Sequence, residues 1–115
     1  MSNSGPARND IANEDAAAIF AALGDPTRVA LVARLSNGSA RSITELAEDS
    51  ALTRQAITKH LQVLEGVGLV NRRKCGRETL YAYNPQPLHD ARQYLDVVDR
   101  QWGQALGRLK DFLER

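Results

Sequence analysis

The segment LTRQAITKHLQVL, residues 52–64, combines a regular apolar spacing with side chains that donate hydrogen bonds. Its apolar residues recur at helical intervals and predict one buried stripe, made of Ala56, Ile57, Leu61 and Leu64. The rest of its surface carries donor-bearing side chains and no carboxylate: Arg54, Gln55, Thr58, Lys59 and Gln62. A face of this kind suits a partner that is negatively charged and rich in hydrogen-bond acceptors. The alternative is a solvated face that is merely basic.

Positive charge is concentrated in the same part of the chain. Residues 53–77 contain six basic side chains and one acidic side chain, Glu65, for a net charge of +5. The rest of the chain has nine basic and thirteen acidic side chains, so the formal net charge of the whole protein is only +1. A compact positive region on an otherwise mildly acidic protein is the footprint expected of a polyanion binder. A chance cluster of solvated charges is the alternative.

Length and composition argue against several other classes of protein. A chain of 115 residues, of which 43% are hydrophobic, predicts one folded domain. We expect a cytoplasmic protein without membrane contact, because the sequence has no transmembrane stretch, no secretory signal and only one cysteine. It contains no acid–base pair, activated nucleophile or phosphate-binding glycine loop at motif spacing. We therefore expect neither an enzyme nor a protein that requires a cofactor or a metal.

Short helices are expected ahead of the donor-rich segment. Residues 1–12 are polar and predict a disordered N-terminal tail, which leaves residues 13–115 as one domain. The Ala-rich run from Glu14 predicts a first helix. Asp25 and Pro26 predict the start of a second helix, because aspartate caps a helix and proline fits its first position.

Two further helix starts are marked by hydroxyl side chains. The sequence SITE, residues 42–45, has the capping-box pattern and predicts a short third helix. Thr53 suits the cap of a fourth helix, formed by the donor-rich segment. This fourth helix should end at the glycines of residues 66–68.

After residue 68 the apolar spacing changes from helical to alternating. The segments LVNRRK and ETLYAY have the composition and alternation of β-strands and flank the tetrad KCGR, whose glycine allows a tight turn. The pattern predicts a β-hairpin with four basic side chains at or near its tip: Arg72, Arg73, Lys74 and Arg77. Two strands are not stable alone, so the hairpin must pack on the helices.

A long last helix, about residues 88–115, is predicted by an apolar residue at every third or fourth position. The spacings of 3, 4, 3, 4, 3, 4 and 3 residues form a heptad seam sustained for more than three repeats. We expect this helix and the first helix to form a homodimer interface through Ile19, Phe20, Leu88, Leu95, Val98, Trp102, Leu106, Leu109 and Phe112. The alternative is that the last helix folds back over its own domain.

Helices two to four followed by a basic hairpin indicate a winged helix-turn-helix, a mainly α fold of about five helices with a small two-stranded β-hairpin as the wing. In this fold the fourth helix enters the major groove of double-stranded DNA. Arg54 and Gln55 have the donor geometry for guanine and adenine, and Thr58 offers either a hydroxyl or a methyl group. The wing would lie along phosphates or in the flanking minor groove. The predicted DNA-binding residues are Ser42, Thr53, Arg54, Gln55, Thr58, Lys59, His60, Arg72, Arg73, Lys74 and Arg77.

Three segments resemble the ArsR/SmtB family of bacterial winged-helix repressors: ALGDPTRVALVARL, ITELAEDSALTRQAITKHLQVLEGVGLV and RRKCGRETLYAYN. They cover about residues 15–100 in the family's order and spacing. The resemblance implies a homodimer built from the first and last helices, two recognition helices on a two-fold symmetric operator, and repression of transcription. The operator sequence, the target genes and any inducer are not implied by it.

Metal binding is not implied either, because other residues occupy the family's ligand positions. The two cysteines of the metal-sensing motif correspond to Ser42 and Thr44, and His89, beside Asp90, has no second histidine downstream. The resemblance is closest to the non-metal members. Three alternatives stay open: a winged-helix module that binds another protein, a metal held by ligands recruited across a dimer, and a thiol switch at Cys75.

Overall fold

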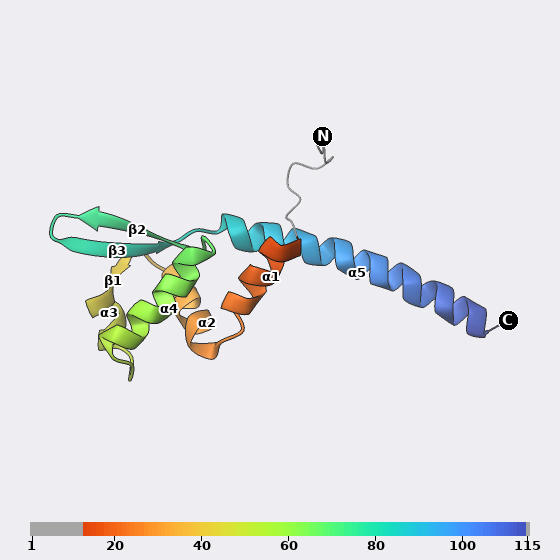
Figure 1. Ribbon diagram of the computed structural model, residues 1–115, viewed down its shortest axis with the longest axis horizontal. Coiled ribbons are helices and arrows are strands. Elements are labelled where there is room, and N and C mark those ends of the chain that lie inside the picture. Colours follow the sequence, from red (N-terminus) through yellow and green to blue (C-terminus); the bar gives the residue numbers. More distant parts are fainter. Residues whose placement is uncertain (1–12, 115) are drawn as a thin grey trace.

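The computed structural model describes residues 13–114 as five helices and a three-stranded sheet, with a long last helix extending from a small globular part (Figure 1). The elements in chain order are α1 (Asn13–Ala22), α2 (Pro26–Ser36), β1 (Arg41–Ser42), α3 (Ile43–Glu48), α4 (Arg54–Gly66), β2 (Val70–Cys75), β3 (Glu78–Tyr83) and α5 (Gln86–Leu113). The expected disordered tail, residues 1–12, lies outside the described residues, as does Arg115.

One hydrophobic core lies between the helices of the globular part and the sheet. Its fully buried large side chains are Leu46, Ile57, Leu61, Leu64, Leu69 and Val70. The predicted stripe of α4 is therefore confirmed for Ile57, Leu61 and Leu64, whereas Ala56 is only partly buried. Burial of each side chain of this size stabilises the fold by about 1.5–3 kcal/mol relative to exposure. The burial of this stripe fixes which face of α4 points to solvent.

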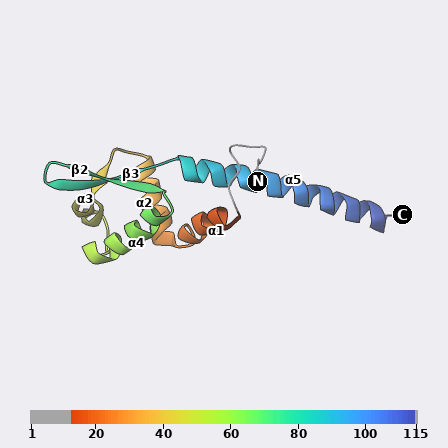
Figure 2. The same ribbon diagram turned by 45° about the horizontal axis from the view of Figure 1, so that its top comes forward.

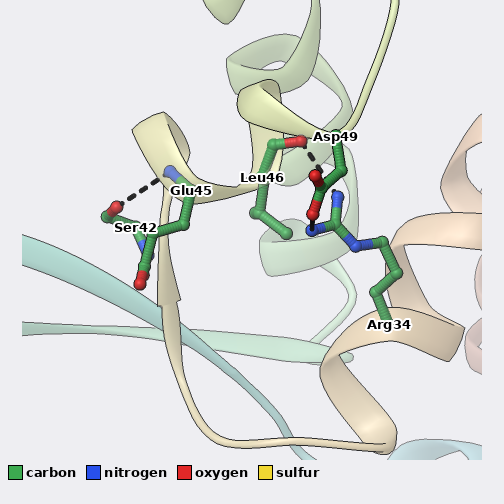
Figure 3. Close-up of polar contacts among 5 residues, drawn as sticks. All are labelled: Arg34, Ser42, Glu45, Leu46 and Asp49. Atoms are coloured by element: carbon green, nitrogen blue, oxygen red, sulfur yellow. Dashed lines mark hydrogen bonds and ion pairs between the residues drawn. The ribbon is translucent and has the colours of Figure 1, made fainter.

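Side-chain caps begin three of the helices, as the sequence predicts. The Asp25 carboxylate accepts the Arg28 amide at 3.0 Å at the start of α2. At the start of α3 the Ser42 hydroxyl accepts the Glu45 amide at 3.1 Å, and the Glu45 carboxylate accepts the Ser42 amide at 2.8 Å (Figure 3). The Thr53 hydroxyl accepts an amide of the first turn of α4 at 3.1 Å. Each cap is worth about 1 kcal/mol and sets the residue at which its helix begins.

Arg34 joins α2 to the end of α3, a contact that the sequence does not reveal. Its Nη1 donates to the Leu46 carbonyl at 2.9 Å, and its Nη2 donates to the Asp49 carboxylate at 3.3 Å (Figure 3). The last carbonyls of a helix have no partner within it, so the guanidinium satisfies one of them. Together with the capping box, this contact holds both ends of the six-residue helix α3. Because α3 packs against α4, Arg34 also constrains the position of α4.

The wing is part of a three-stranded antiparallel sheet rather than the two-stranded hairpin that the sequence predicts. Strands β2 and β3 form the hairpin, with Val70 opposite Tyr83 and Cys75 opposite Glu78, and Gly76 in its turn has a φ of 62°. The two-residue strand β1 pairs with the other edge of β3, giving the order β1-β3-β2. Two residues are too few to show an alternating pattern, which is why the sequence did not reveal β1.

Helix α5 begins at Gln86, slightly earlier than predicted, and runs to Leu113. At 1.5 Å per residue it is about 42 Å long. Its first turns pack on the globular part, where Ala91 is fully buried and α5 contacts α1. The remainder projects away from the globular part (Figures 1 and 2), so the alternative in which it folds back over its own domain is wrong. No single helix within residues 13–114 is both long enough and apolar enough to cross a membrane. The bent pair α1 and α2, taken together, meets the criteria of length and composition.

Asp25 gives the fold a pH dependence on the acid side. The Arg28 amide that donates to this carboxylate lowers the pKa of Asp25 below its ordinary value of 3.8, against a partial burial that raises it. The unfolded state therefore binds the proton more tightly than the folded state. The stabilisation from Asp25 is complete above about pH 5, begins to fall as the unfolded state takes up its proton, and is lost as the pH falls through the lower folded pKa.

The variant Asp25→Asn tests this contribution, because asparagine still caps the helix but does not titrate. We expect urea unfolding to show a smaller loss of stability between about pH 5 and pH 2 for Asp25→Asn than for the wild type. The same loss in both proteins would contradict the role of the charged carboxylate.

Candidate nucleic-acid interface

The face of α4 opposite its buried stripe carries the donor-rich side chains. Its exposed donor-bearing residues are Arg54, Gln55, Lys59 and Gln62, and Thr58 beside them is partly exposed. The only carboxylate of α4, Glu65, lies in its last turn and not among these residues. Burial of the stripe thus turns an acid-free set of donors toward solvent.

The wing presents four cationic side chains near its tip. Arg72, Arg73, Lys74 and Arg77 are all exposed. Alternation along β2 places Arg72 and Lys74 on one face of the strand and Arg73 on the other. An open hollow of about 320 Å³ is lined by Arg72, Arg73, Lys74 and Thr79. The wing can therefore meet an anion from more than one side.

The structure brings these two basic segments to one end of the molecule. The start of α4 and the tip of the wing lie at the end opposite the C-terminal end of α5, with α3 close to both (Figures 1 and 2). We call the exposed face of α4 and the four cationic side chains of the wing the basic surface. An extended polyanion can contact both parts of this surface at once, which a compact anion cannot.

Glu65 and Arg72 form an ion pair that connects the end of α4 to the wing. The Arg72 Nε lies 3.2 Å from the Glu65 Oε2, and the two side chains are 58% and 33% exposed, respectively. A pair this exposed contributes little to stability, typically about 0–1 kcal/mol. It does place the one carboxylate of the positive segment against one of its guanidinium groups. The sequence showed both residues but not their contact, because the contact depends on how the hairpin packs against α4.

Polar atoms of three more residues predicted to bind DNA, Ser42, Thr53 and His60, contact other groups of the protein near helix starts. The Thr53 hydroxyl caps α4, although Thr53 itself is exposed. Ser42 is only 7% exposed, and its hydroxyl caps α3 rather than facing solvent. The His60 Nδ1 lies 3.8 Å from the Asp25 Oδ2 and 3.4 Å from the Arg28 Nη1. His60 therefore faces the start of α2 and lies outside the basic surface.

The predicted dimer interface divides into a buried part and an exposed part. Ile19, which the sequence places in the dimer interface, is 3% exposed and lies in the core of its own chain. Phe20 and Leu88 are partly buried against the same core, and Val98 is partly buried on α5. Six large apolar side chains along one face of α5 are 49–70% exposed: Leu95, Trp102, Leu106, Leu109, Phe112 and Leu113. A contiguous apolar face of this kind marks an interaction surface. We call these six residues the α5 stripe.

The remaining reactive side chains do not converge on a common point. Within the described part of the chain, no three His, Cys, Asp or Glu side chains are placed to hold a metal ion. Cys75 is a free, exposed cysteine at the end of β2. His89 is exposed, and the neighbouring Asp90 carboxylate accepts the Gln86 amide side chain at 2.7 Å. The polar side chains that do share a surface are those of α4 and the wing.

Known proteins are similar to this chain in sequence. A family model described as a helix-turn-helix domain matches residues 23–73. The chain is 42% identical over 82 residues to YuzN of Bacillus subtilis, an uncharacterized HTH-type transcriptional regulator, covering 66% of this chain and 87% of YuzN. It is 33% identical over 80 residues to the HTH-type transcriptional repressor SmtB of Mycobacterium tuberculosis, covering 70% of this chain and 57% of SmtB.

Solved structures share the fold. An ArsR-like transcriptional regulator from Rhodococcus sp. RHA1 matches with a TM-score of 0.79 and 33% identity, covering 86% of this chain and 92% of that one. A homodimeric winged helix-turn-helix DNA-binding domain from Mycobacterium bovis matches with a TM-score of 0.61 and 21% identity, covering 79% and 84% of the two chains. The predicted fold class, a winged helix-turn-helix, is confirmed.

The Glu65–Arg72 pair predicts a variant that binds DNA more tightly. Glu65→Gln keeps the size of the side chain, removes a negative charge next to the basic surface and removes the ion pair that engages the Arg72 guanidinium. We expect a severalfold higher affinity for duplex DNA of any sequence, with a log–log salt slope steeper by up to about 0.9 per chain, because one more phosphate is neutralised. Titrations at several salt concentrations measure both quantities.

Glu114→Gln is the matched control, because it makes the same change at an exposed position at the far end of α5. It should leave affinity and slope almost unchanged. Equal gains in the two variants would mean that net charge, rather than the released Arg72, accounts for the effect.

Proposed function

Since the chain belongs to the ArsR/SmtB family of helix-turn-helix transcriptional regulators, we propose that it is a homodimeric repressor that binds a two-fold symmetric DNA operator. The observation that carries the proposal is the basic surface, in which an acid-free helix face and a cationic wing lie at one end of the molecule. Double-stranded DNA offers both a groove for the helix and a row of phosphates for the wing.

The two parts of the basic surface perform different tasks on DNA. Helix α4 enters the major groove, where the Arg54 guanidinium pairs with the O6 and N7 of guanine and the Gln55 amide pairs with the N6 and N7 of adenine. Arg73, Lys74 and Arg77 lie along the phosphates, which supply affinity and register but no sequence information. The absence of carboxylates on α4 follows from the same role, because a carboxylate would repel the phosphates.

The α5 stripe supplies the contact between two copies of the chain. Its exposed apolar side chains lie outside the protein's own core and favour burial against an identical helix. The homodimeric state of the Mycobacterium bovis domain supports this assembly, and the name of SmtB as a repressor supports repression. Two α4 helices about 34 Å apart then fit successive major grooves on one side of the duplex, and occupancy of a promoter excludes the transcription machinery.

Substitutions in α4 and in the wing should separate sequence selection from general affinity. Gln55→Ala should reduce the preference at one base position per half-site by about 1–3 kcal/mol and affect random DNA little. Arg73→Ala should weaken operator and random duplex alike and reduce the log–log salt slope by about 0.9 per chain. Binding titrations on the selected operator and on random DNA measure both effects.

Gln62→Ala is the control for the amide, because Gln62 is exposed on the same helix about two turns further on. It should leave the preference at the Gln55 position unchanged. Equal losses on operator and random DNA for Gln55→Ala would exclude Gln55 as a base-reading residue.

A charge placed in the α5 stripe should separate the two copies. Leu109→Glu puts a carboxylate on the apolar face, and burying it unpaired costs more than the interface gains. We expect sedimentation to show a monomer, and operator affinity to fall at least tenfold because one half-site contact is lost. Gln104→Glu adds the same charge on the opposite face of α5 and should remain a dimer. A dimeric Leu109→Glu protein would exclude the α5 stripe as the dimer interface.

A further inference from the structure

The hydroxyl group of Thr58 is turned back onto the helix that carries it. Its Oγ1 donates to the Arg54 carbonyl, four residues earlier, at 2.7 Å. This distance is the usual one for a hydroxyl–oxygen hydrogen bond. Thr58 is partly exposed, and its neighbours Arg54, Gln55 and Lys59 on the same side of α4 are exposed. Thr58 therefore belongs to the helix face that meets a ligand, although its polar group does not point toward one.

A threonine whose single hydroxyl proton is already donated has no donor left for DNA, and its oxygen here is turned toward the helix backbone. It cannot donate to a phosphate or to a base acceptor such as the N7 of a purine. The two branches on Cβ occupy different staggered positions, so a hydroxyl that faces the backbone carbonyl leaves the methyl group Cγ2 as the outward branch. The chemistry that Thr58 offers at the surface of α4 is therefore that of one methyl group.

We propose that Thr58 selects thymine by packing its methyl group against the C5-methyl of that base in the major groove. Thymine is the only one of the four bases that presents an apolar group there. Arg54 and Gln55, within one turn of Thr58 on the helix, present polar groups for guanine and adenine. The inference rests on the proposed function and adds to it one apolar position in each half-site, close to the bases read by Arg54 and Gln55.

The sharpest probe is a change in DNA that removes only the methyl group. Each thymine of one operator half-site is replaced in turn by deoxyuridine, which keeps every hydrogen-bonding group. We expect the wild-type protein to lose about fourfold in affinity at one of these positions, the value of burying one methyl-sized group. At the same position a cytosine should weaken binding, and 5-methylcytosine should recover about fourfold relative to cytosine.

Two protein variants show that Thr58 is the residue that senses the methyl group. Thr58→Val keeps both branches on Cβ without the hydroxyl, so it should retain the deoxyuridine effect. Thr58→Ser keeps the hydroxyl and removes the methyl, so it should bind thymine and deoxyuridine operators equally. Unfolding midpoints of both variants show whether either change affects the fold, and the experiments with modified DNA on the wild-type protein do not depend on them.

The outcomes separate this inference from the proposed function. A protein that prefers no sequence over random DNA contradicts the proposed function itself. A protein that selects an operator but is indifferent to deoxyuridine at every position overturns only the role of Thr58. The same conclusion follows if Thr58→Ser keeps the deoxyuridine effect and Thr58→Val loses it, because the hydroxyl oxygen would then be accepting a base amino group.

Discussion

The burial of Ile57, Leu61 and Leu64 in α4 is the constraint on which the rest of the geometry depends. A rotation of α4 by one residue, about 100° around its axis, would move part of this stripe to solvent and carry exposed polar side chains such as Gln55 toward the core. The first change loses hydrophobic stabilisation, and the second removes polar groups from water without new partners. Because both costs act in the same direction, the helix has one orientation, and the donors on its other face point outward as a consequence.

Hydrophobic burial is not directional, so the exact placement of α4 depends on hydrogen bonds at the helix ends. The caps of α2, α3 and α4 define where each helix starts. The Arg34 guanidinium ties the last turn of α3 to α2 and leaves little freedom in the turn that leads to α4. Each of these hydrogen bonds contributes little to the stability of the fold. Their main effect is to fix where the helices lie relative to one another. An α4 helix displaced by about an ångström would still be folded, but its donors would lose good hydrogen-bond geometry with a partner placed for the original position.

Local signals made much of this fold predictable from the sequence. The helix starts follow from Asp25, Ser42 and Thr53, whose caps depend only on residues within one turn, and the buried stripe of α4 follows from its spacing. Contacts between distant segments were not predictable. The strand β1, the hydrogen bonds from Arg34 to the end of α3, and the Glu65–Arg72 pair all depend on how the elements pack. Ile19 illustrates the same limit, because its spacing shows an apolar face but not whether that face turns to its own core or to another chain.

The way α5 leaves the globular part has a mechanical consequence. The globular part holds the first turns of α5, and the remainder of the helix projects beyond that joint as a rod of roughly 30 Å. A tilt of about 5° at the joint moves the far end of the rod by about 3 Å. In a two-fold assembly held together by these rods, a tilt in each copy changes the distance between the two α4 helices, and the two changes add. The stiffness of one short helix–helix joint then sets how narrow a range of spacings the assembly tolerates.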